Sequence, residues 1–81
     1  MLKLLFNHEF LNIKFMEASN KKVYVLNTKE NKIYSLENYK KIYIFYHKKE
    51  SYNAVLNCIN IAENYDNYLA GTWKPAPAEG S

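Results

Sequence analysis

The chain has 81 residues, which predicts a single domain, and 48% hydrophobic residues, which argues against disorder. Its formal charge of +3 comes entirely from lysine, and this mild excess argues against an acidic mimic of nucleic acid and against a histone-like tail. Its one cysteine excludes an internal disulfide and fits a reducing cytoplasm, and the lack of a run of about 18 apolar residues predicts no membrane span.

The composition is biased toward residues with AT-rich codons. Phe, Tyr, Met, Ile, Asn and Lys supply 42 of the 81 residues, and the sequence contains neither arginine nor glutamine. This bias indicates a low-GC genome or a mobile element within one. It also weakens any argument that rests only on the abundance of lysine, asparagine or tyrosine.

Five short runs predict half-buried β-strands, because apolar residues alternate in them and most are rich in β-branched or aromatic side chains. In chain order they are residues 2–6, 11–15, 23–26, 33–36 and 42–46. The polar gaps between them are too short for parallel crossovers, so neighbouring strands are expected to pair antiparallel. Residues 1–70 contain no glycine, and we expect asparagine to adopt positive φ in the gaps, at Asn7, Asn20, Asn31 and Asn38.

An amphipathic helix is predicted from about Tyr52 to Ala70, with Ser51 as its N-cap. Its apolar stripe consists of Val55, Cys58, Ile59, Ala62, Tyr65 and Leu69. The predicted fold is therefore α+β: an antiparallel meander of four to five strands, with one C-terminal helix packed on one face through Val55, Ile59, Ala62 and Leu69. Residues 1–70 form the domain.

Five asparagines recur on the opposite side of this predicted helix, within about 80° of its surface. They are Asn53, Asn57, Asn60, Asn64 and Asn67. Asparagine is a mediocre helix former, so a row of five asparagines on one side of a helix is unexpected. It is either an uncharged recognition face for a partner or a solvated face that reflects codon bias.

The last residues, 71–81, differ abruptly from the rest. They hold both glycines, both prolines and the only tryptophan. We interpret this tail as derived from a vector or linker. The alternative is a native extension, in which Gly71 would be the left-handed residue after the helix.

Catalysis is not expected, and no cofactor or metal site is predicted. Cys58 falls on the apolar stripe, where lone cysteines are usually inert packing residues. His8 and His47 have no partner at a spacing typical of a zinc site or a catalytic pair. A glycine-free body also excludes a glycine-rich phosphate loop.

Nucleic-acid binding is one alternative function. Lysine pairs could hold phosphates around a sheet whose tyrosines stack bases. The pairs are Lys21 and Lys22, Lys40 and Lys41, and Lys48 and Lys49. Arginine, the residue that usually forms bidentate hydrogen bonds to guanine and to phosphate, is absent.

Protein binding fits more of the sequence, because tyrosine and asparagine suit interfaces. The asparagine stripe, with Tyr24, Tyr34 and Tyr43, is the predicted partner-binding set. The wider outer patch adds Leu26, Leu36 and Phe45, and such a patch also suits a homodimer. The leading hypothesis is a small cytoplasmic protein, of phage or mobile-element origin, that blocks a surface of a larger host protein or complex; an anti-CRISPR type of inhibitor is the first class to test.

Overall fold

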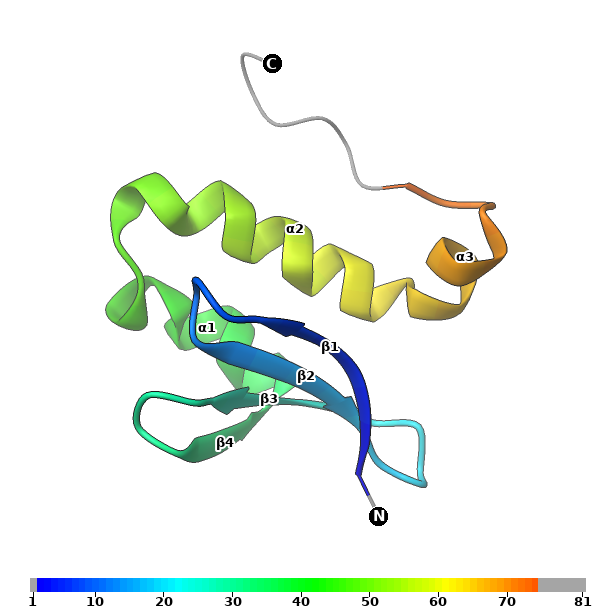
Figure 1. Ribbon diagram of the computed structural model, residues 1–81, viewed down its shortest axis with the longest axis horizontal. Coiled ribbons are helices and arrows are strands. Elements are labelled where there is room, and N and C mark those ends of the chain that lie inside the picture. The colour runs from blue at the N-terminus through cyan, green and yellow to red at the C-terminus, as the bar shows by residue number, and fades with distance from the viewer. Residues whose placement is uncertain (1, 75–81) are drawn as a thin grey trace.

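The computed structural model describes residues 2–74, and it is an α+β fold built on one four-stranded antiparallel sheet (Figure 1). The strands lie side by side in chain order, so the sheet is a meander. They are β1 (Lys3–His8), β2 (Ile13–Glu17), β3 (Val23–Asn27) and β4 (Lys32–Ser35). Four of the five predicted strands and their antiparallel pairing are confirmed.

The turns between the strands use positive φ at three residues other than glycine. These are Asn12, Lys21 and Asn31. Only Asn31 was among the four predicted positions, because Asn7 lies within β1 and Asn38 within the first helix. Asn20 instead shapes its turn with its side chain, whose Oδ1 accepts a hydrogen bond from the backbone N–H of Lys22 at 3.1 Å.

The fifth predicted strand is wrong: residues 42–46 belong to helix α1 (Leu36–Tyr46). The helix begins directly after β4, where the Ser35 hydroxyl accepts a hydrogen bond from the Asn38 N–H at 3.2 Å and caps the first turn. Inward positions then recur at helical spacing, with Tyr39 fully buried and Ile42 and Tyr43 packed against the core. Tertiary burial of this stripe outweighs the strand preference of the sequence IYIFY.

The predicted C-terminal helix is present but divided. A short 3-10 turn, η1 (Lys49–Ser51), leads into α2 (Tyr52–Glu63), which is followed by α3 (Tyr65–Ala70). Ser51 occupies the N-cap position of α2, although its side chain makes no capping hydrogen bond to a described residue. Val55, Cys58, Ile59 and Ala62 are buried, which confirms the predicted apolar stripe of α2.

The helix breaks at Asn64, whose backbone leaves helical geometry with φ −120° and ψ 30°. The chain then places Tyr65 on β1, where its hydroxyl donates to the Leu5 carbonyl at 2.8 Å and its ring packs near Phe6. Because α3 no longer continues the line of α2, Leu69 is 66% exposed. The predicted packing of Leu69 on the sheet is therefore wrong.

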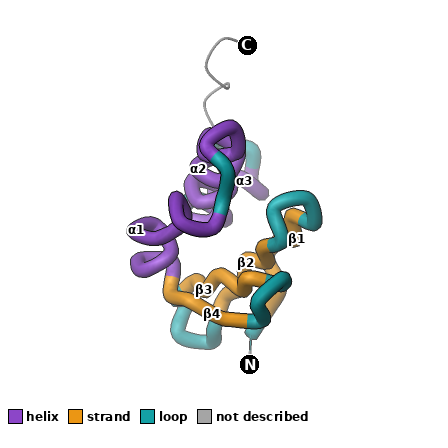
Figure 2. The backbone as a smooth tube through the Cα atoms, turned by 90° about the vertical axis from the view of Figure 1, so that its left-hand side faces the viewer, coloured by secondary structure: helices purple, strands orange, loops and turns teal. Residues whose placement is uncertain are grey.

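All three α-helices lie on the same side of the sheet, as the two perpendicular views show (Figures 1 and 2). The core fills the space between the layers, where Ile13, Phe15 and Val25 of the sheet meet Tyr39 of α1 and Val55 of α2, all fully buried. Phe6 and Phe15 stack with ring centroids 4.6 Å apart, which ties the edge strand β1 into this core. Within the described residues, no helix is long and apolar enough to cross a bilayer.

Gly71 ends α3 with φ 79°, the left-handed conformation that suits glycine after a helix. The Thr72 N–H closes this end by donating to the Asn67 carbonyl at 3.0 Å. This is the geometry expected of Gly71 in a native extension, while the origin of the predicted tail stays a prediction. Its last residues, 75–81, lie outside the described part of the chain.

Candidate interaction surface

The sheet has a second face, on which no helix of residues 2–74 lies (Figure 2). Strand register identifies its residues, because directly paired residues share a face and side chains alternate along each strand. One row across the sheet is Leu4, Met16, Tyr24 and Ser35, and the next is Asn7, Lys14, Leu26 and Ile33. We call these eight residues the open face.

The open face is unusually apolar for the uncovered side of an antiparallel sheet, which normally carries polar residues. Five of its eight residues are apolar or aromatic: Leu4, Met16, Tyr24, Leu26 and Ile33. Leu4 and Ile33 are 54% and 49% exposed, although each lies on a strand of the folded sheet. Lys14 is the one charged residue among the eight.

The three tyrosines predicted to bind a partner do not share one surface. Tyr24 lies on the open face. Tyr34 pairs with the buried Val25 and therefore points toward the helices, where its ring lies near Tyr39 and Tyr46. Tyr43 belongs to α1 rather than to a strand, and its ring meets Tyr52 edge-on at a centroid distance of 5.6 Å.

Aromatic hydroxyls form a polar network between the sheet edge and α1. The Tyr34 and Tyr46 hydroxyls are 2.8 Å apart, and this hydrogen bond raises the pKa of Tyr34 to about 12. The hydroxyl of the buried Tyr39 is hydrogen-bonded to His47 Nε2. Burial, which disfavours the charged imidazolium, and then the nearby His8 lower the pKa of His47. The Tyr34–Tyr46 bond therefore joins β4 to α1, whereas the Tyr39–His47 bond lies within α1 and its C-cap.

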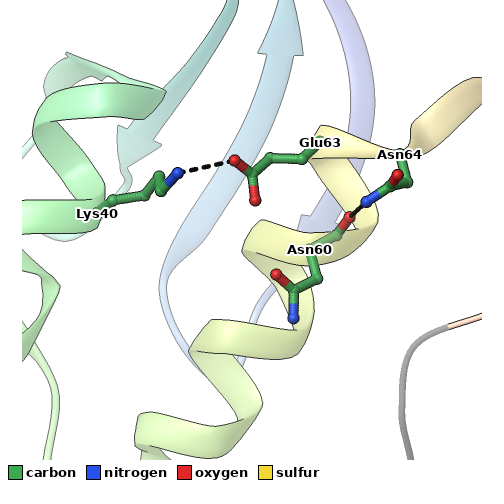
Figure 3. A network of polar contacts seen from close by, with 4 residues as sticks. All are labelled: Lys40, Asn60, Glu63 and Asn64. Carbon is green, nitrogen blue, oxygen red and sulfur yellow. Dashed lines mark hydrogen bonds and ion pairs between the residues drawn. The ribbon is translucent and has the colours of Figure 1, made fainter.

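The predicted asparagine stripe faces away from the sheet but is not continuous. Asn53, Asn57 and Asn60 lie on α2 opposite its buried residues, and their side chains make no hydrogen bond to another described residue. Asn64 ends α2, and its Nδ2 donates to the Asn60 carbonyl at 3.1 Å (Figure 3). The Asn67 carbonyl accepts from the Thr72 hydroxyl at 3.2 Å, at the end of α3. Part of the stripe thus serves helix termination.

The asparagine stripe lies on the side of α2 opposite its buried residues, and the open face lies on the side of the sheet away from the helices, so the two face in opposite directions. Figures 1 and 2 show the helices on one side of the sheet. One flat partner surface cannot cover both. The two predicted partner-binding sets are therefore alternatives in the folded protein.

The lysine pairs are spread over both ends of the molecule. Lys21 and Lys22 lie in the turn between β2 and β3, whereas Lys48 and Lys49 lie between α1 and α2. Lys40 and Lys41 lie on α1, and the Lys40 Nζ is 2.8 Å from the Glu63 Oε2 at the end of α2 (Figure 3). This hydrogen bond to the carboxylate raises the pKa of Lys40.

The residues that carry reactive groups are arranged for packing. Cys58 is buried, and burial raises the pKa of its thiol to about 11, so the nucleophilic thiolate is scarce at neutral pH. Among residues 2–74, no three His, Cys, Asp or Glu side chains are close enough together to hold a metal ion.

Leu4, Met16 and Ile33 are the apolar residues of the open face that are absent from both the predicted partner-binding set and the wider outer patch. Their alternation with Leu5, Phe15 and Tyr34 is visible in the sequence. Alternation alone does not say which of the two sets faces the helices, because a shift of one residue exchanges the faces.

In comparisons with known proteins, the chain matches no family model, no curated protein and no solved structure.

Proposed function

We propose that this chain is a non-catalytic binding protein that occludes a surface of a larger protein partner through the open face of its sheet. The supporting observation is the apolar character of that face, with Leu4 and Ile33 about half exposed in regular strands. Exposed apolar patches on small proteins mark interaction sites, because leaving them in water costs free energy that binding recovers.

The charge on the open face favours a different protein over a second copy of the same chain. Lys14 lies on the inner strand β2, between Asn7 and Leu26. A two-fold symmetric pair would set the same patch against itself and bring two Lys14 ammonium groups toward each other. The partner we propose instead presents an apolar surface with a carboxylate opposite Lys14.

Size and composition suggest the biological setting of this proposal. A short chain with AT-rich codon bias is typical of phage and mobile-element proteins that act in the host cytoplasm. Within that setting we propose inhibition of host defence, with the anti-CRISPR type as the first class to test.

The second candidate is a nucleic-acid-binding regulator that uses the lysine pairs and the sheet tyrosines. This function receives less support. The lysine pairs occupy both ends of the molecule. Of the three tyrosines predicted to bind a partner, only Tyr24 lies on the open face. A salt titration separates this function from protein binding, since phosphate contacts make affinity fall steeply with salt.

The test is capture of a partner from lysates of low-GC bacteria by the full chain, followed by titration of the purified complex. The variant Leu4→Thr with Ile33→Thr removes exposed apolar area and keeps the strand preference of both positions. We expect this variant to weaken binding about tenfold or more, as loss of apolar anchor contacts does in other interfaces.

The matched control is Asn53→Ser with Asn60→Ser on the outer side of α2. We expect it to bind as the unaltered chain does. If the asparagine variant loses the partner and the sheet variant keeps it, the open face is not the binding surface.

A further inference from the structure

Three connections that are distant in sequence meet at one end of the sheet and enclose a hollow of about 520 Å³. They are the β1–β2 turn with Phe10, the β3–β4 turn with Lys29, and the segment from α1 to α2 with His47, Lys48 and Ser51. The volume falls within the range of small-ligand sites in proteins.

Hydrogen bonds hold the walls of this hollow in place. The buried Asn27 accepts the backbone N–H groups of Lys29 and Glu30, each at 3.0 Å, through its Oδ1. The Thr28 N–H donates to the Asn12 carbonyl at 2.9 Å and so joins the two strand turns. His47 is anchored by its bond to Tyr39. The site is therefore largely formed before any ligand arrives.

The charges around the hollow favour an anion. Two exposed lysines line it, Lys29 and Lys48, against one carboxylate, Glu50. Ser51 adds a neutral polar residue to the third wall. Lysine ammonium groups bind phosphate well as point charges, without the planar match that arginine supplies.

Phe10 supplies the second kind of contact. It is 85% exposed, the most exposed large apolar side chain in the described chain, although it lies in a hydrogen-bonded turn. Its ring has no aromatic partner within residues 2–74. A free aromatic ring beside lysines is the combination on which nucleotide bases stack while their phosphates are neutralised.

We propose that this hollow binds a nucleotide, with the phosphate held by Lys29 and Lys48 and the base stacked on Phe10. The phosphate-bearing ligand is either a free mononucleotide or one unit of a single strand. This site lies at the end of the sheet that carries the β1–β2 and β3–β4 turns, and it uses none of the open-face residues. The nucleotide proposal can therefore be tested independently of the proposed protein partner.

The test is an NMR titration of the isotope-labelled full chain at low salt with four probes: AMP, adenosine, inorganic phosphate and an oligothymidylate strand. We expect AMP to shift the backbone signals of residues 10–12, 27–29 and 47–51. Adenosine lacks the phosphate of AMP, and inorganic phosphate lacks its base, so each is expected to bind at least tenfold more weakly than AMP. Binding of the strand but not of AMP would identify single-stranded nucleic acid as the source.

Two variants at exposed positions probe the two contacts. We expect Lys29→Gln with Lys48→Gln to weaken binding about tenfold and to reduce the salt dependence of strand binding by about two phosphate contacts. Phe10→Ser is expected to abolish the preference for AMP over phosphate. The control, Lys21→Gln with Lys22→Gln at the other end of the sheet, removes the same charge and should leave AMP binding unchanged.

The proposal is overturned if the control weakens binding as much as the Lys29 and Lys48 variant, because the attraction is then only net charge. It is also overturned if a short polyglutamate peptide shifts the same signals as strongly as AMP does. A dispersed spectrum of each variant establishes that it is folded.

Discussion

The two faces of the sheet carry similar apolar residues but differ in how far these are buried. On the covered face, Ile13, Phe15 and Val25 are fully buried beneath the helices, whereas on the open face Leu4 and Ile33 are about half exposed. Burial of apolar area stabilises the fold on the first face, while on the second the same chemistry is available to a partner. Side-chain type alone therefore does not separate the buried face from the uncovered face; the position of the helices does.

The largest test of this difference compares neighbours on β2 whose side chains point to opposite faces. We expect Phe15→Ala on the covered face to lower the free energy of unfolding by about 3–5 kcal/mol, because it leaves a cavity among the helices. Small domains have only about 5–15 kcal/mol in total, so this variant should be largely unfolded at moderate urea. Urea unfolding followed by circular dichroism measures the effect.

The matched variant is Met16→Ala on the open face, for which we expect a change within about 1 kcal/mol. Equal losses from the two variants would mean that the open face is packed against something in the folded chain.

A smaller effect is expected from pH, through His47 at the end of α1. Burial lowers the pKa of His47 below its ordinary 6.5, so the folded state favours the neutral imidazole bonded to Tyr39. The unfolded chain binds the proton more readily, so the contribution of His47 to stability is complete above about pH 6.5 and is lost as the pH drops toward the lowered pKa. Urea unfolding at a series of pH values measures this slope.

The control is His47→Gln, whose amide can still accept from the Tyr39 hydroxyl but does not titrate. We expect the loss between pH 6.5 and pH 5 to shrink in this variant, leaving the carboxylates to act at lower pH. An unchanged slope would assign the acid sensitivity to another group.

The smallest expected effect on stability is at the open face itself. Ile33→Thr alone should change the free energy of unfolding by no more than about 0.5 kcal/mol, because the side chain is half exposed and threonine keeps the strand preference. Thermal unfolding of the two proteins side by side measures this difference. A large loss would show that Ile33 contributes to the core rather than to a free surface.

The spacing of apolar residues correctly predicted the elements in which a single period, that of a strand or that of a helix, dominates. The strands around Ile13, Phe15, Val23 and Val25 alternate cleanly, and the stripe from Val55 to Ala62 repeats at helical spacing; both predictions are confirmed. In residues 42–46 two periods compete, since Ile42, Ile44 and Tyr46 alternate while Tyr39, Tyr43 and Tyr46 follow a helix. The alternation predicts a strand, but the Ser35 cap and the burial of Tyr39 favour the helix.

The candidate sites were less predictable than the fold. The predicted asparagines do lie outward on α2, but the break at Asn64 and the turn of Tyr65 onto β1 divide their stripe and expose Leu69. The contact between Tyr65 and Leu5 spans sixty positions in the chain, so no local pattern reveals it. The same holds for the approach of Phe10, Lys29 and Lys48, which come from three separate connections.

The sequence by itself determined the class of this protein: an α+β domain with an antiparallel meander and a C-terminal helix whose inner stripe is apolar. These properties follow from residue periodicity, which acts over a few positions. Only the tertiary structure decided that residues 42–46 are helical, which face of the sheet the helices cover, and which side chains remain in water. Those outcomes depend on burial between distant segments, and a shift of one residue in a strand would have exchanged the core with the open face.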